Sequence, residues 1–399
     1  MMLNDYSAIE GRSPGFIKLL FGLGFLVLLG AGAFVYVEHY GHAVTGMNNQ
    51  IVWGLPHIFA ISLLVMASGA LNMGSMSTVF AVNQFEQFGR FSAFLAIALL
   101  IGGLTVLMLD LGRPDNMLLP MVYMNFTSMF TWNVFLYTGF MTLCLLYLWT
   151  MFEYKQYKKL VGTAAFGWRL VLTTGTGSIF GVIQGREVFG SAITAPTFVA
   201  VSLTSGTALG ILLLVHTFRQ TNREMDERLI FGMRNALMFF LMLVAYLLIV
   251  EKFTRLYDPA SQAVQMWILT GSWAWLYWIG VWGMGVIIPL ALLFNHTLGN
   301  RVSGVLLASG CVVIGAFCFV AHTLLAGQSY PFDMFPGFKV ESSFQDGVVG
   351  SYTPTLPELF LGLGGVGISG LIYLLGIRFF RMLPKKGVVP PGWDLPWSP

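Results

Sequence analysis

Charge is scarce in this sequence, and that scarcity excludes most classes of soluble protein. Only 10% of the 399 residues are Asp, Glu, Lys or Arg, whereas 56% are hydrophobic. An ordinary soluble domain has about 25% charged residues, which keep its surface solvated. We therefore exclude a soluble enzyme, a nucleic-acid-binding protein and a disordered chain.

Cysteine is scarce as well. The three cysteines, Cys144, Cys311 and Cys318, all lie in apolar stretches, and the sequence contains no Cys-x-x-Cys motif. Iron–sulfur clusters, cysteine-ligated zinc sites and covalently attached haem depend on clustered cysteines. The sequence therefore predicts no metal site and no iron–sulfur cluster in this chain.

Long apolar runs separated by short charged clusters make up most of the chain. Runs of about 20 residues are long enough to cross a bilayer as helices, and they lack the strict alternation of a membrane β-barrel. The first run is too long for a signal-peptide core, so we expect a retained helix. The sequence predicts an all-α polytopic membrane protein in a lipid bilayer. We expect about ten transmembrane helices, over 15–37, 51–80, 91–111, 129–152, 167–189, 194–216, 229–250, 271–294, 302–326 and 356–377.

Basic residues are distributed unevenly between the two sides that ten crossings define. The N-terminus, the even-numbered loops and the C-terminus share one side, and most of the 21 Lys and Arg residues, Arg169 included, are assigned to it. Loops rich in Lys and Arg stay in the cytoplasm. We therefore expect a multi-pass protein of the bacterial cytoplasmic membrane with both termini in the cytoplasm. The other side receives only Arg113, Arg186, Lys252, Arg255 and Lys339.

The opposite side is rich in acidic residues and carries a long loop with Tyr330, Phe332, Phe335 and Phe338. Two interpretations remain open. Acidic residues tolerate translocation, and a long loop with aromatic residues is also typical of a docking surface for an extracytoplasmic partner.

A weak internal repeat divides the chain. The spacing of Pro, Ala, Ser and Leu at 56–63 recurs at 196–203, and Asp110 with Arg113 aligns approximately with Glu251 and Arg255. Chance similarity between apolar helices is the alternative. Because both repeated runs start on the same side, duplication predicts two parallel-repeat four-helix bundles flanked by an N-terminal and a C-terminal helix.

These boundaries give five segments. We expect an N-terminal cytoplasmic segment with the first helix and outer loop, a first four-helix bundle, a second bundle, an extracytoplasmic loop, and the last helix with a cytoplasmic tail. The segments are 1–50, 51–192, 193–327, 328–355 and 356–399.

Ionisable residues near membrane depth are costly and point to function. Asp110 and Arg113 close the third predicted helix, either as a carboxylate–guanidinium pair that contacts a ligand or as a structural clamp on the loop. Glu251 and Lys252 are their counterpart in the other half, and Glu187 ends the fifth helix on the same side. We expect any proton pathway to use Asp110, Glu187, Glu251 and Lys252.

Two further positions on that side suit a ring-shaped ligand. His57, at the outer start of the second helix, can exchange a proton with a hydroxyl or carbonyl group. Trp132 and Asn133 open the fourth helix, where they can pack on a ring and bond a carbonyl. The alternative for each is an ordinary hydrogen-bonded residue at a helix start. The pairs His57 with His322 and His216 with His296 also leave a haem b membrane anchor open.

The motif Asp-Leu-Gly-Arg-Pro at 110–114, the stretch 127–133 and the doubled four-helix plan resemble the NrfD/PsrC family. This family comprises quinone-interacting membrane subunits of bacterial respiratory oxidoreductases. The stretches 53–57 and 326–337 resemble its ten-helix branch, which includes the HybB and DsrP subunits, and favour the DsrP type of sulfur metabolism.

The resemblance implies a haem-free subunit that binds a quinone or quinol, menaquinone or ubiquinone, near the outer surface. It implies electron exchange with an extracytoplasmic ferredoxin-like iron–sulfur subunit, within a complex that can include a cytochrome c or a catalytic subunit. His57 matches the family's quinone-contacting His, whereas Asn133 stands where the family often has Asp.

We expect the quinone head between the second and fourth helices, touching His57 and either Trp132 or Asn133, with Asp110 and Arg113 nearby. The protein then acts as one subunit of an oxidoreductase rather than as an enzyme by itself. Besides the haem b anchor, a secondary ion or solute transporter that works alone remains the alternative.

Overall fold

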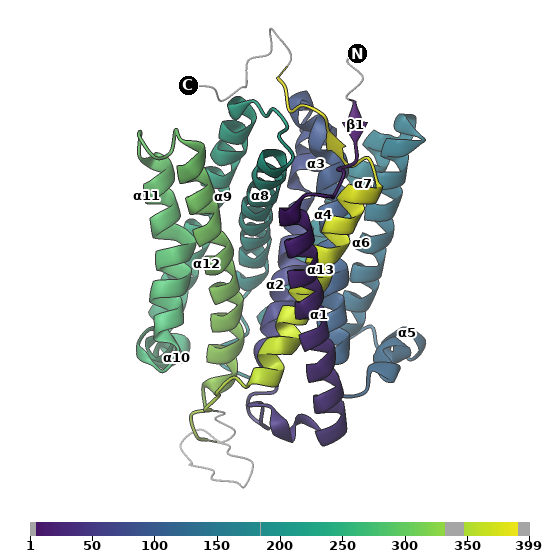
Figure 1. The fold of residues 1–399 in the computed structure, drawn as a ribbon. Coiled ribbons are helices and arrows are strands. Elements are labelled where there is room, and N and C mark those ends of the chain that lie inside the picture. Colours follow the sequence, from purple (N-terminus) through teal and green to yellow (C-terminus); the bar gives the residue numbers. More distant parts are fainter. Residues whose placement is uncertain (1–4, 184, 332–346, 390–399) are drawn as a thin grey trace.

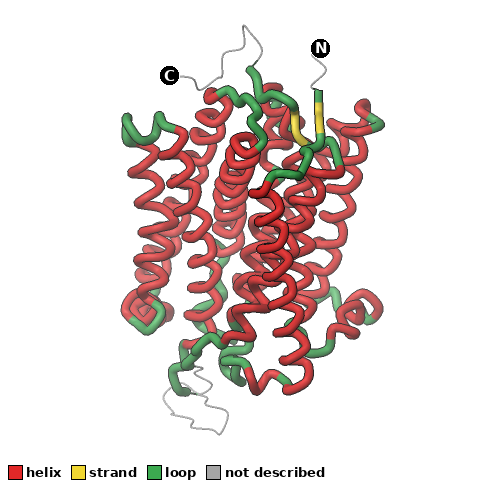
Figure 2. The backbone as a smooth tube through the Cα atoms, in the orientation of Figure 1, coloured by secondary structure: helices red, strands yellow, loops and turns green. Residues whose placement is uncertain are grey.

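The computed structural model describes residues 5–183, 185–331 and 347–389, and almost all of the described chain is helical (Figures 1 and 2). Phe332, Phe335, Phe338 and Lys339 lie outside these ranges. The short 3-10 helices are η1 (His42–Val44), η2 (Asn83–Phe88), η3 (Pro114–Leu118) and η4 (Lys155–Tyr157), and η5 (Leu276–Ile287) is a π-helix. The α-helices are α1 (Pro14–Tyr40), α2 (Leu55–Ala70), α3 (Asn72–Thr78), α4 (Gly89–Leu109), α5 (Leu119–Val122), α6 (Met129–Phe152), α7 (Lys158–Val182), α8 (Thr194–Gln220), α9 (Glu227–Tyr257), α10 (Pro259–Thr270), α11 (Ile288–Phe294), α12 (Val302–Ser329) and α13 (Leu356–Phe379).

Nine helical segments of the described residues are long and apolar enough to cross a membrane. They are α1, α2 with α3, η2 with α4, α6, α8, α9, η5 with α11, α12 and α13. The remaining expected span, 167–189, corresponds to α7, which packs between α6 and α8. Its Gly, Thr and basic residues lower its hydrophobicity. The predicted all-α polytopic membrane protein is confirmed, and α7 is the one long helix of the described residues that is not among the nine segments.

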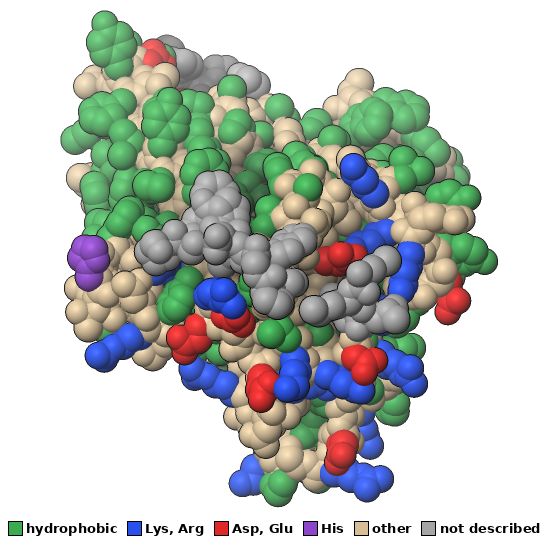
Figure 3. Space-filling view, turned by 90° about the horizontal axis from the view of Figure 1, so that it is seen from above, with side chains coloured by type: hydrophobic (Ala, Val, Ile, Leu, Met, Phe, Trp, Pro, Cys, Tyr) green, Lys and Arg blue, Asp and Glu red, His purple; other side chains and the backbone are tan. Residues whose placement is uncertain are grey.

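Both ends of the described chain lie at the same end of the molecule, the upper one in Figure 1. There β1 (Tyr6–Ser7) pairs antiparallel with β2 (Leu383–Pro384). Lys and Arg side chains gather on this upper face (Figure 3). An even number of crossings and the predicted clustering of basic charge around the termini both agree with this arrangement.

The helices α2 and α8, which carry the two copies of the repeated spacing, cross in direct contact at the centre of the molecule. A Cβ atom on Gly206 would lie 2.1 Å from the backbone carbon of Gly69, and the Ser202 hydroxyl donates to the Val65 carbonyl oxygen at 2.8 Å. Small residues permit such close approach of membrane helices. Helices α4 and α6 pack on the α2 side, α7 lies between α6 and α8, and α9, η5, α11 and α12 belong to the α8 side.

The position of Arg169 differs from the predicted one. The sequence predicts Arg169 on the basic side of the membrane, but in the structure it lies on α7, inside the bundle, and is only 2% exposed. Its guanidinium donates to the Ser68 carbonyl at 3.0 Å and to the Asn72 side chain. Asn72 begins α3 directly after α2 ends, and its amide donates to the Leu203 carbonyl and the Thr207 hydroxyl of α8. A buried guanidinium therefore joins α7 to the break in the second span, and Asn72 extends the connection to α8.

The eighth predicted helix, 271–294, is not one continuous α-helix. After α10, on the lower face, the crossing helix begins as the π-helix η5 and continues as α11 (Figure 1). Pro289 is the second residue of α11. Proline has no backbone N–H to donate to the preceding turn. Long π-helices are rare and often occur at functional sites.

Candidate functional site

The candidate site lies at the lower face, where α2 begins and α4 ends. Gly54 occupies the N-cap position of α2 and Pro56 lies in its first turn, where the missing N–H costs nothing. The N–H of Leu55 donates instead to the Tyr352 hydroxyl at 2.7 Å. This start of the helix places His57 in the first turn of α2, with its side chain facing the bundle.

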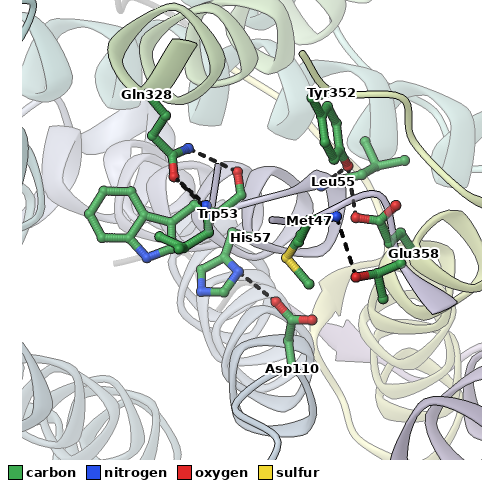
Figure 4. Close-up of polar contacts among 10 residues, drawn as sticks. Met47, Trp53, Leu55, His57, Asp110, Gln328, Tyr352 and Glu358 are labelled. Carbon is green, nitrogen blue, oxygen red and sulfur yellow. Dashed lines mark hydrogen bonds and ion pairs between the residues drawn. The ribbon is translucent and has the colours of Figure 1, made fainter. Parts of the chain in front are cut away.

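His57 and Asp110 form the centre of the site (Figure 4). The imidazole Nδ1 lies 2.5 Å from the Asp110 carboxylate oxygen Oδ2, and the two side chains are 14% and 2% exposed. Asp110 caps the end of α4, and its own N–H donates to the Val106 carbonyl. Because Asp110 engages Nδ1, the second nitrogen, Nε2, points away from the carboxylate and can contact a ligand.

Gln328, at the end of α12, holds the segment before α2 in place. Its side-chain oxygen accepts the N–H groups of Val52 and Trp53, both at 2.9 Å, and its amide donates to the Trp53 carbonyl at 3.1 Å. The Trp53 ring lies 6.5 Å from that of His57 and 6.3 Å from that of Phe130 on α6. The imidazole therefore lies beside the Trp53 ring, and the Gln328 side chain bonds both the N–H and the carbonyl of the Trp53 backbone.

Glu358 anchors the same segment from the start of α13. Its carboxylate accepts the Tyr352 hydroxyl at 2.9 Å, the Gly46 N–H at 3.2 Å, and the N–H and hydroxyl of Thr355. Burial and the Glu358 carboxylate raise the pKa of Tyr352. Tyr352 therefore stays protonated and can donate to Glu358 while it accepts from the start of α2.

Arg113 does not pair with Asp110, and the expected carboxylate–guanidinium pair is wrong. Gly112, with φ of 68°, turns the chain away from the bundle directly after α4. The Arg113 side chain is 73% exposed and bonds Asp115, 3.2 Å away. This bond lowers the pKa of the Asp115 carboxyl. The partner of Asp110 is His57 instead.

Trp132 and Asn133 lie near the site, but their polar atoms have other partners. The Trp132 indole N–H donates to the Phe126 carbonyl at 2.9 Å, and the residue is 44% exposed. The Asn133 amide donates to the Met129 carbonyl and to the Gly175 carbonyl of α7. The residue of this stretch that packs on Trp53 is Phe130, which the sequence did not single out.

A second polar cluster lies on the α8 side of the molecule, around a cavity of about 60 Å³. Glu251 and Lys252 line it together with Tyr277 and His322. Glu187 contributes its backbone carbonyl to Arg255, while its side chain is exposed. Of the expected proton-pathway residues, Glu251 and Lys252 thus meet in one cluster, and Asp110 belongs to the other.

Several residues of the two clusters were missed by sequence reasoning. Gln328, Tyr352 and Glu358 belong to segments remote from 51–57 in the sequence. The spacing Thr355-x-x-Glu358 is a helix-capping signal, but it says nothing of the contact between Glu358 and Gly46. His57 and His322, considered above as a haem pair, lie in different clusters. Within the described ranges, no group of three His, Cys, Asp or Glu side chains is arranged to hold a metal ion.

Three known proteins align with most of the chain. It is 30% identical over 393 residues to the Hdr-like menaquinol oxidoreductase integral membrane subunit of Archaeoglobus fulgidus, spanning 97% of this chain and 98% of that protein. It is 22% identical to the C subunit of the polysulfide reductase of Wolinella succinogenes, over 71% and 96% of the two sequences. It is 21% identical to the menaquinone reductase integral membrane subunit of Nitratidesulfovibrio vulgaris, over 93% and 91%. Residues 43–331 match the family model described as polysulphide reductase, NrfD.

Proposed function

Because the chain belongs to the polysulphide reductase NrfD family, we propose that it is the haem-free membrane subunit at which a respiratory oxidoreductase complex oxidises quinol or reduces quinone. The contact between His57 and Asp110 is the observation that carries this proposal. Two relatives are named for menaquinol or menaquinone, which favours menaquinone over ubiquinone as the ligand.

The chemistry of quinol oxidation matches the His57–Asp110 arrangement. A quinol gives up two protons with its two electrons, and a base near neutral pKa that lies within hydrogen-bond reach accepts such protons efficiently. In our proposal Nε2 of His57 faces the quinol hydroxyl or quinone carbonyl. Asp110 orients the ring and stabilises the imidazolium that forms. Trp53 and Phe130 supply ring surfaces against which the quinone head packs, with Trp132 and Asn133 at the periphery of the site.

Electrons leave the quinol for a partner in this proposal. Cys144 lies on α6, and both Cys311 and Cys318 lie on α12. We propose that the acceptor is a ferredoxin-like iron–sulfur subunit docked at the lower face, with a cytochrome c or catalytic subunit beyond it. The Lys and Arg side chains on the upper face support a cytoplasmic location for that face and for the termini, with the lower face on the outer side of the membrane. The name of the polysulfide reductase relative supports a role in sulfur metabolism, and within that role we propose the DsrP type.

Protons released at His57 have two routes in this proposal. They exchange directly with the lower aqueous phase, or they cross the membrane through Asp110 and the second cluster, where Glu251 and Lys252 lie beside the Glu187 loop. The second route makes the subunit a proton-translocating one.

Binding of a tail-less naphthoquinone to the purified protein, followed by quenching of tryptophan fluorescence, tests the site. We expect His57→Gln and Asp110→Asn each to raise the Kd for naphthoquinone about tenfold or more. The first variant removes the imidazole that contacts the ligand, and the second removes the carboxylate that orients this imidazole. The matched control is His296→Gln, which replaces an exposed histidine just after the end of α11. Equal Kd values for wild type, His57→Gln and Asp110→Asn would show that the quinone binds elsewhere.

A further inference from the structure

The cavity on the α8 side has mixed polar walls that suit water. Thr197 and Thr323 line it and donate their hydroxyl hydrogens to their own helix backbones, so their oxygen lone pairs can face the interior as acceptors. Lys252 lines it as a donor. A cavity of about 60 Å³ holds several water molecules when it offers donors and acceptors of this kind.

His322 is the unexplained group of this cavity. Its side chain is 8% exposed, and its Nε2 atom has no hydrogen-bond partner among the described residues. Buried polar atoms are normally paired, by protein or by water. The His322 ring packs at 5.2 Å on the ring of Tyr277, which lies on the π-helix η5, and Lys252 Nζ lies 5.2 Å from the same Tyr277 ring. Lys252 also donates to the Gln265 side chain at 2.9 Å.

One loop connects this cavity with the His57–Asp110 site. Arg186 donates to the Gln328 carbonyl at 2.6 Å and to the Gln50 carbonyl at 2.8 Å, on the segments that hold Trp53. The next two residues of the same loop are held from the cavity side, where Arg255 donates to the carbonyls of Glu187 and Val188 at 2.5 and 2.6 Å.

The Phe180 ring contacts both the His57–Asp110 site and the cavity. The Phe180 ring packs edge-on at 5.8 Å against Trp53, beside His57, and Phe180 also lines the cavity. A shift of Trp53 on ligand binding therefore reaches the cavity through a packed ring as well as through the 185–190 loop.

We propose that this cavity is a hydrated proton-binding site, in which Lys252 and His322 exchange a proton through water, and that its protonation is coupled to ligand occupancy at His57–Asp110. A proton that leaves the Lys252 ammonium is taken by water or by His322 Nε2, so the exchange needs no other reactant. The inference rests on the proposed function, because the coupling requires a quinone at His57.

Few charged groups face this exchange. From α9 come Glu251, Lys252 and Arg255, from η5 comes Tyr277, and from α12 comes His322. The lining residues of α7, α8 and α10 are uncharged. Removing Lys252 or His322 thus removes a titrating group and leaves the remaining charges of the cavity in place.

The pH dependence of naphthoquinone binding to the purified full-length protein tests the coupling. Linkage is reciprocal, so each proton coupled to binding changes Kd by up to about tenfold per pH unit. We expect Lys252→Met and His322→Gln each to flatten the plot of log Kd against pH between about pH 5 and 9, relative to wild type. Lys18→Met, which removes an exposed lysine from α1, is the control and should keep the wild-type profile.

Two failures are distinguishable. If Lys252→Met and His322→Gln both keep the wild-type pH profile, the coupled proton site is overturned while the quinone site stands. If wild type binds no naphthoquinone at any pH, the proposed function is overturned, and the coupling falls with it.

Discussion

His57 and Asp110 join the first turn of α2 to the end of α4, with Nδ1 and Oδ2 2.5 Å apart. The carboxylate is almost fully buried and the imidazole is nearly so. A buried carboxylate that engages one imidazole nitrogen fixes the orientation of the ring and leaves the other nitrogen for proton exchange. The quinone chemistry proposed for this protein depends on that one contact, and the neighbouring residues differ in how much they add to it.

Arg113→Gln should change the Kd for naphthoquinone less than about twofold. Arg113 is exposed and bonds Asp115, and such surface ion pairs contribute little. Fluorescence titration of the purified variant measures the effect. A loss of affinity as large as that of His57→Gln would show that Arg113 reaches the ligand after all.

Gln328→Leu should weaken both stability and ligand binding. The substitution leaves the partly buried N–H groups of Val52 and Trp53 without their acceptor, and an unpaired donor costs up to about 1–3 kcal/mol when it is fully buried. We expect a lower Tm in detergent and a higher Kd for naphthoquinone, because Trp53 loses its support. Gln262→Leu, at an exposed position on α10, is the control. Unchanged Tm and Kd in Gln328→Leu would mean that the segment before α2 is held by other contacts.

Asn72→Leu should destabilise the protein more than Arg169→Met. The first variant leaves a buried guanidinium without the Asn72 oxygen that accepts from it, and a buried hydrogen bond to a charged group is worth about 1.5–3 kcal/mol. The second variant removes the buried charge together with its desolvation cost. Thermal unfolding of both variants in the same detergent compares them. The opposite order of Tm values would show that Arg169 stabilises the bundle chiefly through its own charge.

Much of the fold could be predicted because it depends on patterns along the sequence, namely the length of apolar runs and the placement of charged residues between them. The apolar run predicted at 129–152 coincides with α6, and the side of each loop follows from counting crossings. Arg169 was misplaced because the helix predicted at 167–189 puts it near the basic-side end, whereas α7 begins at Lys158 and hydrogen-bonding partners on α2 and α3 accommodate Arg169 inside the bundle. The π-helix η5 has no simple sequence signature beyond Pro289.

The site could be predicted only in part, for a geometric reason. His57 and Asp110 both stand at helix ends on one side of the membrane, so their common depth could be predicted. Which partner Asp110 takes depends on the direction of the backbone after α4, and the left-handed conformation at Gly112 sends Arg113 outward. Gln328 and Glu358 reach the start of α2 from remote segments, and no spacing in a single sequence records such contacts.

The rate of quinol oxidation by the assembled complex is the most direct test of the central claim. We predict that His57→Gln lowers kcat/KM about 10²–10⁴-fold, the range expected for loss of a general base, while the complex keeps its full set of subunits and His296→Gln keeps the wild-type rate. A His57→Gln complex that oxidises quinol at the wild-type rate would contradict the assignment of His57 and Asp110 as the quinone site.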